Sequence, residues 1–215
     1  MLTIIIMAGQ NVKSVHFKMI CHENKIIFIH LPRSGGSVLE KQIVGRNQGK
    51  INIWHKHLDQ EMSKKIYKDY WNEYRKITLV RNPFDWLVSY LHFDAVELKS
   101  PGPWNFKFFL DRVIDFNSLS AVPSYGWMTQ PCRFFDTFNP QEMDCILTFE
   151  DSIIGKNVDS YNSLPNVKPI SIPNKKEGPE TKRKRKFQSY YDDEMKSKVE
   201  GFFSRELKYF NYKFD

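Results

Sequence analysis

Two short segments of this chain carry residue types suited to binding phosphate groups. The first, FIHLPRSGGSVLE over residues 28–40, places Gly35 and Gly36 directly before a predicted helix. Glycines let a backbone approach an anion closely, and the N–H groups and dipole of a helix N-terminus attract negative charge. Arg33 adds a permanent positive charge with a planar set of donors, and Ser37 adds a hydroxyl. The segment therefore predicts an anion-binding loop.

The second segment, ITLVRNPFDWLVSY, covers residues 77–90. Arg81 follows a predicted strand, and Ser89 lies about two turns into the predicted helix after it. Ligands of open α/β sheets bind at the carboxyl ends of the strands. We therefore expect Arg81 and Ser89 to converge on one phosphate.

The first segment differs from the loop of ATP-dependent P-loop enzymes. That loop carries a lysine directly after its glycines. Here the basic residue, Arg33, precedes the glycines. This order disfavours a kinase-like phosphotransferase, which stays the main alternative.

Three residues are candidates for a general base. His55 and His57 flank Lys56 just before a predicted helix, and Glu40 lies on the helix after the loop. Imidazole is the usual base near neutral pH, and its pKa is about 6.5 when unperturbed. Two histidines two residues apart could also bind a metal, but no third ligand occurs at suitable spacing. No metal site is expected.

The elements that must position these residues alternate between strand and helix. Buried strands are predicted at 25–31, 76–80 and 144–149, and a further short strand at 1–9. Helices are predicted at 38–44 with Ser37 as its cap, at 58–74, at 83–92 with Asn82 as its cap, and at 106–113. A closing helix carries Met195, Val199, Phe202, Phe203 and Phe210 on one stripe. This alternation predicts an α/β fold with a central parallel sheet.

Composition narrows the class of protein. A length of 215 residues predicts a single domain over 1–215. Residues 175–186 hold seven basic and two acidic side chains, so they supply +5 of the net charge of +7. A broad nucleic-acid-binding face is therefore not expected. Three cysteines without a CxxC pair argue against a disulfide framework or a zinc site.

The apolar run at residues 1–9 is far shorter than the roughly 20 residues of a membrane span, and no basic residue precedes it. We therefore expect no membrane span and a cytoplasmic location.

The two phosphate segments together resemble the motifs of sulfotransferases. FIHLPRSGGS is similar to their 5′-phosphosulfate loop, and VRNPFDWLVSY is similar to their 3′-phosphate motif. ILTFED at 146–151 resembles the family's strand before its lid region. The ending from Tyr190 to Phe214 resembles the closing helix of the carbohydrate-type, Golgi-like branch of that family. The chain departs from the family in two places: Arg33 replaces the usual lysine of the loop, and Trp86 stands where a basic residue is common.

The resemblance implies a P-loop NTPase-like three-layer sandwich that binds PAPS (3′-phosphoadenosine 5′-phosphosulfate) and releases PAP, its desulfated product, without a metal ion. The sulfuryl group would go to an acceptor hydroxyl, which the resemblance implies to be that of a sugar. A relative that binds nucleotide without catalysis is a further alternative. Residues 94–143 would form a variable acceptor side, where Trp104, Phe106, Tyr125 and Trp127 fit a core better than a sugar platform. The implied donor-binding residues are Arg33, Ser34, Gly35, Gly36, Ser37, Val38, Arg81, Ser89, Arg183 and Arg185. The implied catalytic residues are Arg33 and His57.

Overall fold

The structure is a computed structural model that describes residues 19–44, 56–92, 105–118, 131–172 and 186–215. Its centre is a four-stranded sheet in the order β1-β2-β3-β4, formed by Ile20–Cys21, Ile26–Ile29, Arg75–Val80 and Cys145–Thr148. β2, β3 and β4 run parallel, in the register Phe28–Ile77 and Ile77–Cys145, whereas the short β1 pairs antiparallel with β2. The sheet is therefore mixed, because a two-residue antiparallel strand adds to the predicted parallel strands.

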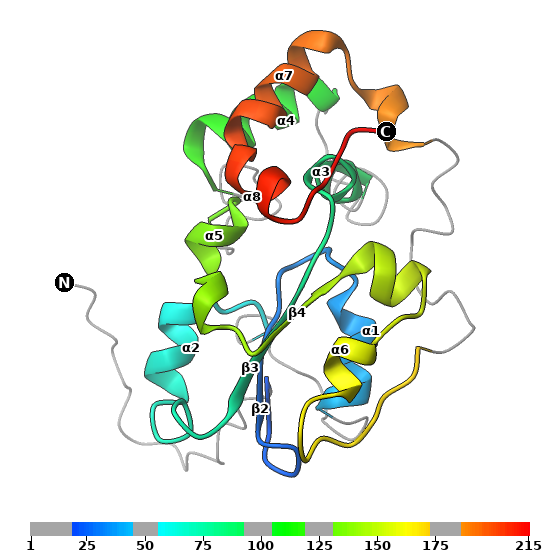
Figure 1. Cartoon of the computed structure of the whole chain (residues 1–215). Coiled ribbons are helices and arrows are strands. Elements are labelled where there is room, and N and C mark those ends of the chain that lie inside the picture. The colour runs from blue at the N-terminus through cyan, green and yellow to red at the C-terminus, as the bar shows by residue number, and fades with distance from the viewer. Residues whose placement is uncertain (1–18, 45–55, 93–104, 119–130, 173–185) are drawn as a thin grey trace, which may run out of the picture.

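Helices cover both faces of this sheet, which gives three layers (Figure 1). Figure 1 shows α2 (Gln60–Ile66) on one face and α1 (Gly36–Ile43) with α6 (Asp159–Asn162) on the other. β2 is buried along its whole length and β3 over its last four residues. Strands buried on both faces are typical of parallel sheets in α/β proteins. The α/β sandwich predicted from the sequence is confirmed.

A second group of helices lies beyond the carboxyl ends of the strands (Figure 1). It consists of α3 (Pro83–His92), α4 (Phe106–Phe116), α5 (Phe134–Thr137), α7 (Asp193–Phe202) and α8 (Ser204–Tyr209), with 3₁₀ turns at Pro140–Glu142 and Phe187–Tyr190. α3 is buried from Pro83 to Leu91, because the sheet edge and the other helices enclose it. It begins where the sequence predicts, since Asn82 Oδ1 accepts a hydrogen bond from Phe84 N at 3.1 Å.

Three local predictions are wrong. Gly35, in a left-handed conformation, occupies the cap position of α1, so Ser37 lies inside the first turn and does not cap the helix. The helix predicted at 58–74 ends at Ile66, and the turns after it bury Tyr67 and Trp71. The closing helix breaks at Phe203 into α7 and α8. The strand predicted at residues 1–9 lies outside the described residues.

The carboxyl ends of β2, β3 and β4 meet at one edge of the sheet. The loop of residues 30–35 follows β2, Arg81 follows β3, and Phe149 follows β4, where a π-helical turn spans Glu150–Ile154. Adjacent parallel strands bring these three segments together although they are far apart in sequence. Within the part of the chain that is described, no helix is both long and apolar enough to cross a membrane.

Candidate functional site

The loop between β2 and α1 has a backbone shape that most side chains would resist. Arg33 has a φ of 59° and Gly35 a φ of 88°. A Cβ atom on Gly35 would lie 2.6 Å from Cδ2 of Phe149, and one on Gly36 would overlap the ring of His30. Both glycines are therefore required, because the chain packs against a ring at each of them. The loop delivers the first N–H groups of α1 to the carboxyl edge of the sheet, where such groups can bind an anion.

The hydroxyl groups of the loop have different surroundings. Ser34 is buried, and its Oγ donates to the carbonyl of Leu31 at 2.6 Å, so it holds the turn closed. Ser37 is exposed in the first turn of α1, and Lys56 Nζ donates to its Oγ at 3.0 Å. Val38 N donates to Gly35 O at 3.1 Å. Of the loop residues expected to bind the donor, Ser37 offers an exposed hydroxyl, whereas that of Ser34 serves the loop itself.

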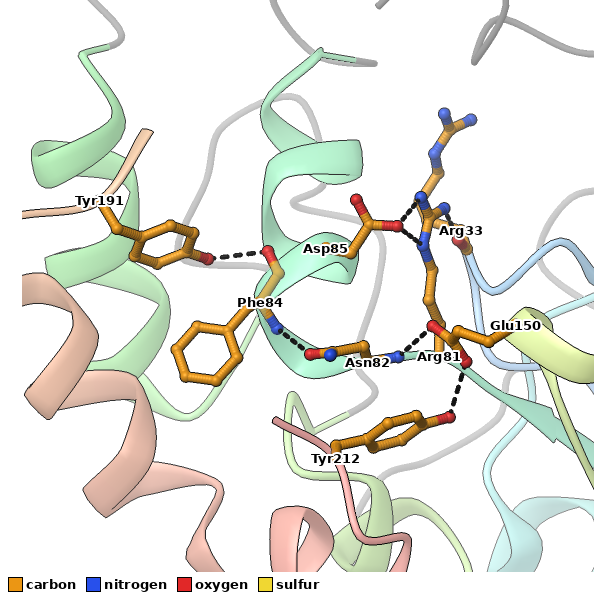
Figure 2. Close-up of polar contacts among 8 residues, drawn as sticks. All are labelled: Arg33, Arg81, Asn82, Phe84, Asp85, Glu150, Tyr191 and Tyr212. Carbon is orange, nitrogen blue, oxygen red and sulfur yellow. Dashed lines mark hydrogen bonds and ion pairs between the residues drawn. The ribbon is translucent and has the colours of Figure 1, made fainter. Parts of the chain in front are cut away.

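Arg81 joins the second phosphate segment to the first (Figure 2). Its Nε donates to Asp85 Oδ2 at 2.7 Å and its Nη2 contacts the same oxygen, while Nη1 donates to the carbonyl of Arg33 at 3.2 Å. The guanidinium lies over the ring of Phe149, with 4.2 Å from Cζ to the ring centroid. Asp85 neutralises and orients Arg81, a role that the i,i+4 spacing of the two residues signals in the sequence. A guanidinium has five N–H donors, so a single arginine can bond to several acceptors at once, here Asp85 and the loop.

Of the remaining residues predicted to bind the donor, some lie within the described part of the chain and others do not. Ser89 lies on α3, two turns beyond Arg81, and is 4% exposed. Arg183, Arg185 and His55 lie outside the described residues. Trp86, which stands where the family commonly has a basic residue, is buried, and its indole N–H donates to the carbonyl of Pro32 at 2.8 Å. That hydrogen bond ties α3 to the start of the loop.

His57 lies beside the loop as a half-buried, neutral imidazole. Its Nδ1 is 3.0 Å from the carbonyl oxygen of His30. A carbonyl only accepts, so Nδ1 carries the proton and Nε2 carries the lone pair. Burial lowers the pKa of His57 to about 4; the hydrogen bond to His30 opposes this shift, and the charges of Lys56 and Arg33 add to it. His57 thus has the protonation state that a general base needs at neutral pH.

His30 belongs to the same cluster but faces the interior. Its ring lies 4.6 Å from that of His57 and 5.3 Å from that of Phe28, and it is 2% exposed. Burial, with smaller contributions from His57 and Lys56, lowers its pKa well below the usual value. His30 therefore supports His57 from the core, as a structural histidine does.

Lys56 is a residue of this site that sequence reasoning missed. Its Nζ lies 2.8 Å from Glu40 Oε2 and 3.0 Å from Ser37 Oγ, so its ammonium sits against the first turn of α1. The signal was its place between the two candidate histidines, but an isolated lysine in a loop usually means only solvated charge. The pairing with Lys56 also occupies Glu40, the alternative base.

Similarity to a solved structure bears on the fold. No family model matches the sequence, and the search of curated proteins found no match. Among solved structures, the chain is similar to a mouse sulfotransferase, SULT7A1, determined with PAP bound. The chain shares its fold with this mouse protein. The similarity covers 89% of this chain and 88% of the mouse protein, with a TM-score of 0.50 and 14% sequence identity. The P-loop-like architecture expected from the two motifs is therefore confirmed, and the Golgi-like, carbohydrate-type branch stays a prediction.

Proposed function

We propose that this protein is a PAPS-dependent sulfotransferase that moves a sulfuryl group onto an acceptor hydroxyl. The observation that carries the proposal is the contact between the two phosphate segments: Arg81 Nη1 reaches the carbonyl of Arg33 at 3.2 Å at the carboxyl edge of the sheet. A donor with phosphate groups at both its 5′ and 3′ positions needs two anion sites that are adjacent but separate. The same fold in the mouse protein holds PAP, the product of such a donor.

The loop residues take the 5′-phosphosulfate in this proposal. The N–H groups of Gly36 and Ser37 and the Ser37 hydroxyl bind its oxygens, and Arg33 and Lys56 neutralise its charge. Arg81 binds the 3′-phosphate, with Ser89 as its expected partner on α3. Charge-assisted hydrogen bonds of this kind contribute about 1.5–3 kcal/mol each.

The chemical step is a displacement at sulfur. The acceptor oxygen forms a bond to sulfur while the bond from sulfur to the 5′-phosphate oxygen breaks, and the electron pair stays on that phosphate. Nε2 of His57 takes the proton of the acceptor hydroxyl, because its lone pair is available on a ring that the lowered pKa keeps neutral. Arg33 and Lys56 stabilise the charge that develops on the leaving oxygen, as donors of an oxyanion hole do. The products are PAP and a sulfate ester.

The acceptor is proposed to be a sugar, on the resemblance to carbohydrate-type enzymes. The acceptor side is expected within residues 94–143, part of which the structure describes as α4 and α5. Phe106 is 8% exposed and packs edge-on against Tyr190 and Tyr191, so it belongs to the core and not to a sugar platform. Trp104, Tyr125 and Trp127 lie outside the described residues.

Calorimetric titration with PAP, AMP and ATP tests the proposal. We expect PAP to bind at least about tenfold more tightly than AMP, because AMP lacks the group that Arg81 would hold. Equal affinities for PAP and AMP would refute the 3′-phosphate site, and a preference for ATP would favour the phosphotransferase alternative. Sulfuryl transfer from radiolabelled PAPS to a panel of sugars and phenols then separates an enzyme from a relative that only binds nucleotide.

A further inference from the structure

One aromatic ring packs against both phosphate segments. Phe149, the first residue after β4, is 3% exposed. Its Cδ2 would lie 2.6 Å from a Cβ atom on Gly35, and the guanidinium of Arg81 lies 4.2 Å from its ring centroid. The loop therefore packs against the same ring on which Arg81 stacks. Any shift of residues 149–150 would move the loop and Arg81 relative to each other.

The next residue, Glu150, forms hydrogen bonds to the residue after Arg81 and to the C-terminal segment (Figure 2). Its Oε1 accepts a hydrogen bond from the backbone N–H of Asn82 at 2.9 Å, and its Oε2 accepts one from the hydroxyl of Tyr212 at 3.0 Å. Asn82 directly follows Arg81, so the first of these bonds anchors the backbone that carries the guanidinium. The carboxyl group thus links the end of β3 to the end of β4 and to the C-terminal segment.

The C-terminal segment also contacts Asn82 directly. Asn82 Nδ2 donates to the carbonyl of Lys213 at 2.7 Å, while its Oδ1 caps α3. Gln188 Nε2 in turn donates to the carbonyl of Phe214 at 3.0 Å. Residues 212–214 are therefore bound both at the carboxyl edge of the sheet and at the turn before α7. Such a segment can transmit its position to Arg81, because the bonds are short and end on the residue next to it.

Burying part of a carboxyl group costs free energy, because the charged form loses water. Burial raises the pKa of Glu150, in spite of the hydrogen bond from Asn82 and the nearby charge of Arg81. Apolar side chains of similar size are often at least as stabilising as a buried charged group. What a carboxylate adds is two acceptor oxygens in one plane, which set the spacing of two donors. Each oxygen of Glu150 accepts from one such donor, Asn82 N or the hydroxyl of Tyr212.

We propose that Glu150 and Tyr212 are positioning residues that set Arg81 for the 3′-phosphate of the donor. The inference rests on the proposed function, because it assigns the 3′-phosphate to Arg81. It predicts that weakening the Glu150–Tyr212 hydrogen bond lowers affinity for the 3′-phosphate selectively. The 5′-phosphate would be affected little, because its loop N–H groups belong to α1.

The test is calorimetric titration of Tyr212→Phe with PAP and AMP. Removing this hydroxyl leaves Glu150 with one donor and lets its carboxyl group turn away from Asn82. We expect PAP affinity to fall about tenfold while AMP affinity stays within twofold of the wild type. Tyr209→Phe, the same change in a tyrosine that is 54% exposed, is the matched control and should leave both affinities unchanged. A second pair of variants separates geometry from charge: Glu150→Ala should lose PAP selectivity, and Glu150→Gln should restore most of it, because a carboxamide can bond to the same two groups.

The outcomes distinguish this inference from the proposed function. If the wild type does not prefer PAP over AMP, the proposed function fails, and the inference fails with it. If the wild type prefers PAP and Tyr212→Phe keeps that preference, Glu150 and Tyr212 do not position Arg81, although the proposed function stands. An equal loss of PAP and AMP affinity would mean a general structural role and would also overturn the inference. If Tyr212→Phe does not fold, the comparison of Glu150→Gln with Glu150→Ala decides.

Discussion

The protonation of His57 offers a sharp quantitative test of the proposed chemistry. An unperturbed imidazole, as the sequence alone would predict, is half protonated at a pH of about 6.5. In the structure, burial and the charges of Lys56 and Arg33 lower the pKa of His57 to about 4. The perturbation to apply is therefore a change of pH between 7 and 4.5.

The two pKa values predict very different behaviour over one pH unit. With a pKa of about 4, the neutral fraction of His57 stays above roughly 95% at pH 5.5. With the ordinary value of about 6.5, it would fall from about half at pH 6.5 to about a tenth at pH 5.5. A base acts only when neutral, so kcat/KM should stay nearly flat between pH 6.5 and 5.5 in so far as His57 controls it. An anionic donor raises the pKa of His57, so the limb in kcat should lie at higher pH than the limb in kcat/KM.

Nuclear magnetic resonance measures this without an acceptor. Long-range ¹H–¹⁵N correlations of the histidine rings, recorded from pH 8 to pH 4.5, report both the pKa and which nitrogen is protonated. His57→Asn assigns the signals. We expect His57 to be the neutral Nδ1–H form from pH 8 down to about pH 5.5 and to show no midpoint near pH 6.5. A midpoint there, or a proton on Nε2, would refute the placement of His57 and its role as the base.

Three further predictions concern the loop between β2 and α1 and the nearby Lys56. Gly35→Ala should lower the free energy of unfolding by about 1–2 kcal/mol in chemical denaturation, because its φ is 88° and a Cβ would lie 2.6 Å from a ring carbon. Gly201→Ala, with open space around its Cβ in α7, is the control and should stabilise by about 0.5–1 kcal/mol. Arg33→Ala should reduce turnover by about 10²–10³-fold with a smaller loss of PAP affinity, whereas Arg33→Lys should keep activity; near-normal turnover in Arg33→Ala would remove this residue from the chemistry. Lys56→Met should weaken PAP binding and raise the pKa of His57 in the same ring titration, and an unchanged pKa would show that the ammonium lies farther away.

Much of the fold was predictable because its signals are local. The start of α3 follows from Asn82 and Pro83, a capping residue and a preferred first helical residue that act within one turn. The strands followed from short apolar runs between polar turns. The helix predicted at 58–74 failed because its apolar residues also fit a series of turns. Tyr67 favours the turns over a continued helix, since its hydroxyl accepts a hydrogen bond from the backbone N–H of Met19 at 3.3 Å and holds the chain near β1.

The candidate site also contains residues that the sequence predicts and residues that it does not. Gly35, Arg81 and His57 stand out by residue type and by their place after a strand or before a helix. Glu150 and Tyr212 do not, because their hydrogen bond joins residues 62 positions apart. Lys56 was missed for another reason: its two partners lie on α1, and only the folded chain shows that its loop returns to that helix. Spacing along a sequence predicts contacts within an element but not between elements that tertiary packing brings together.

The left-handed backbone of Arg33 has a consequence for attempts to improve this protein. A residue other than glycine with a φ of 59° is destabilised by about 1 kcal/mol, and glycine would remove most of that strain. Arg33→Gly would then relax the loop while deleting the cation proposed to stabilise the leaving oxygen. A screen that selects variants for thermal stability alone would therefore tend to enrich a well-folded protein that lacks this proposed catalytic cation. Any such selection should include a step that demands turnover.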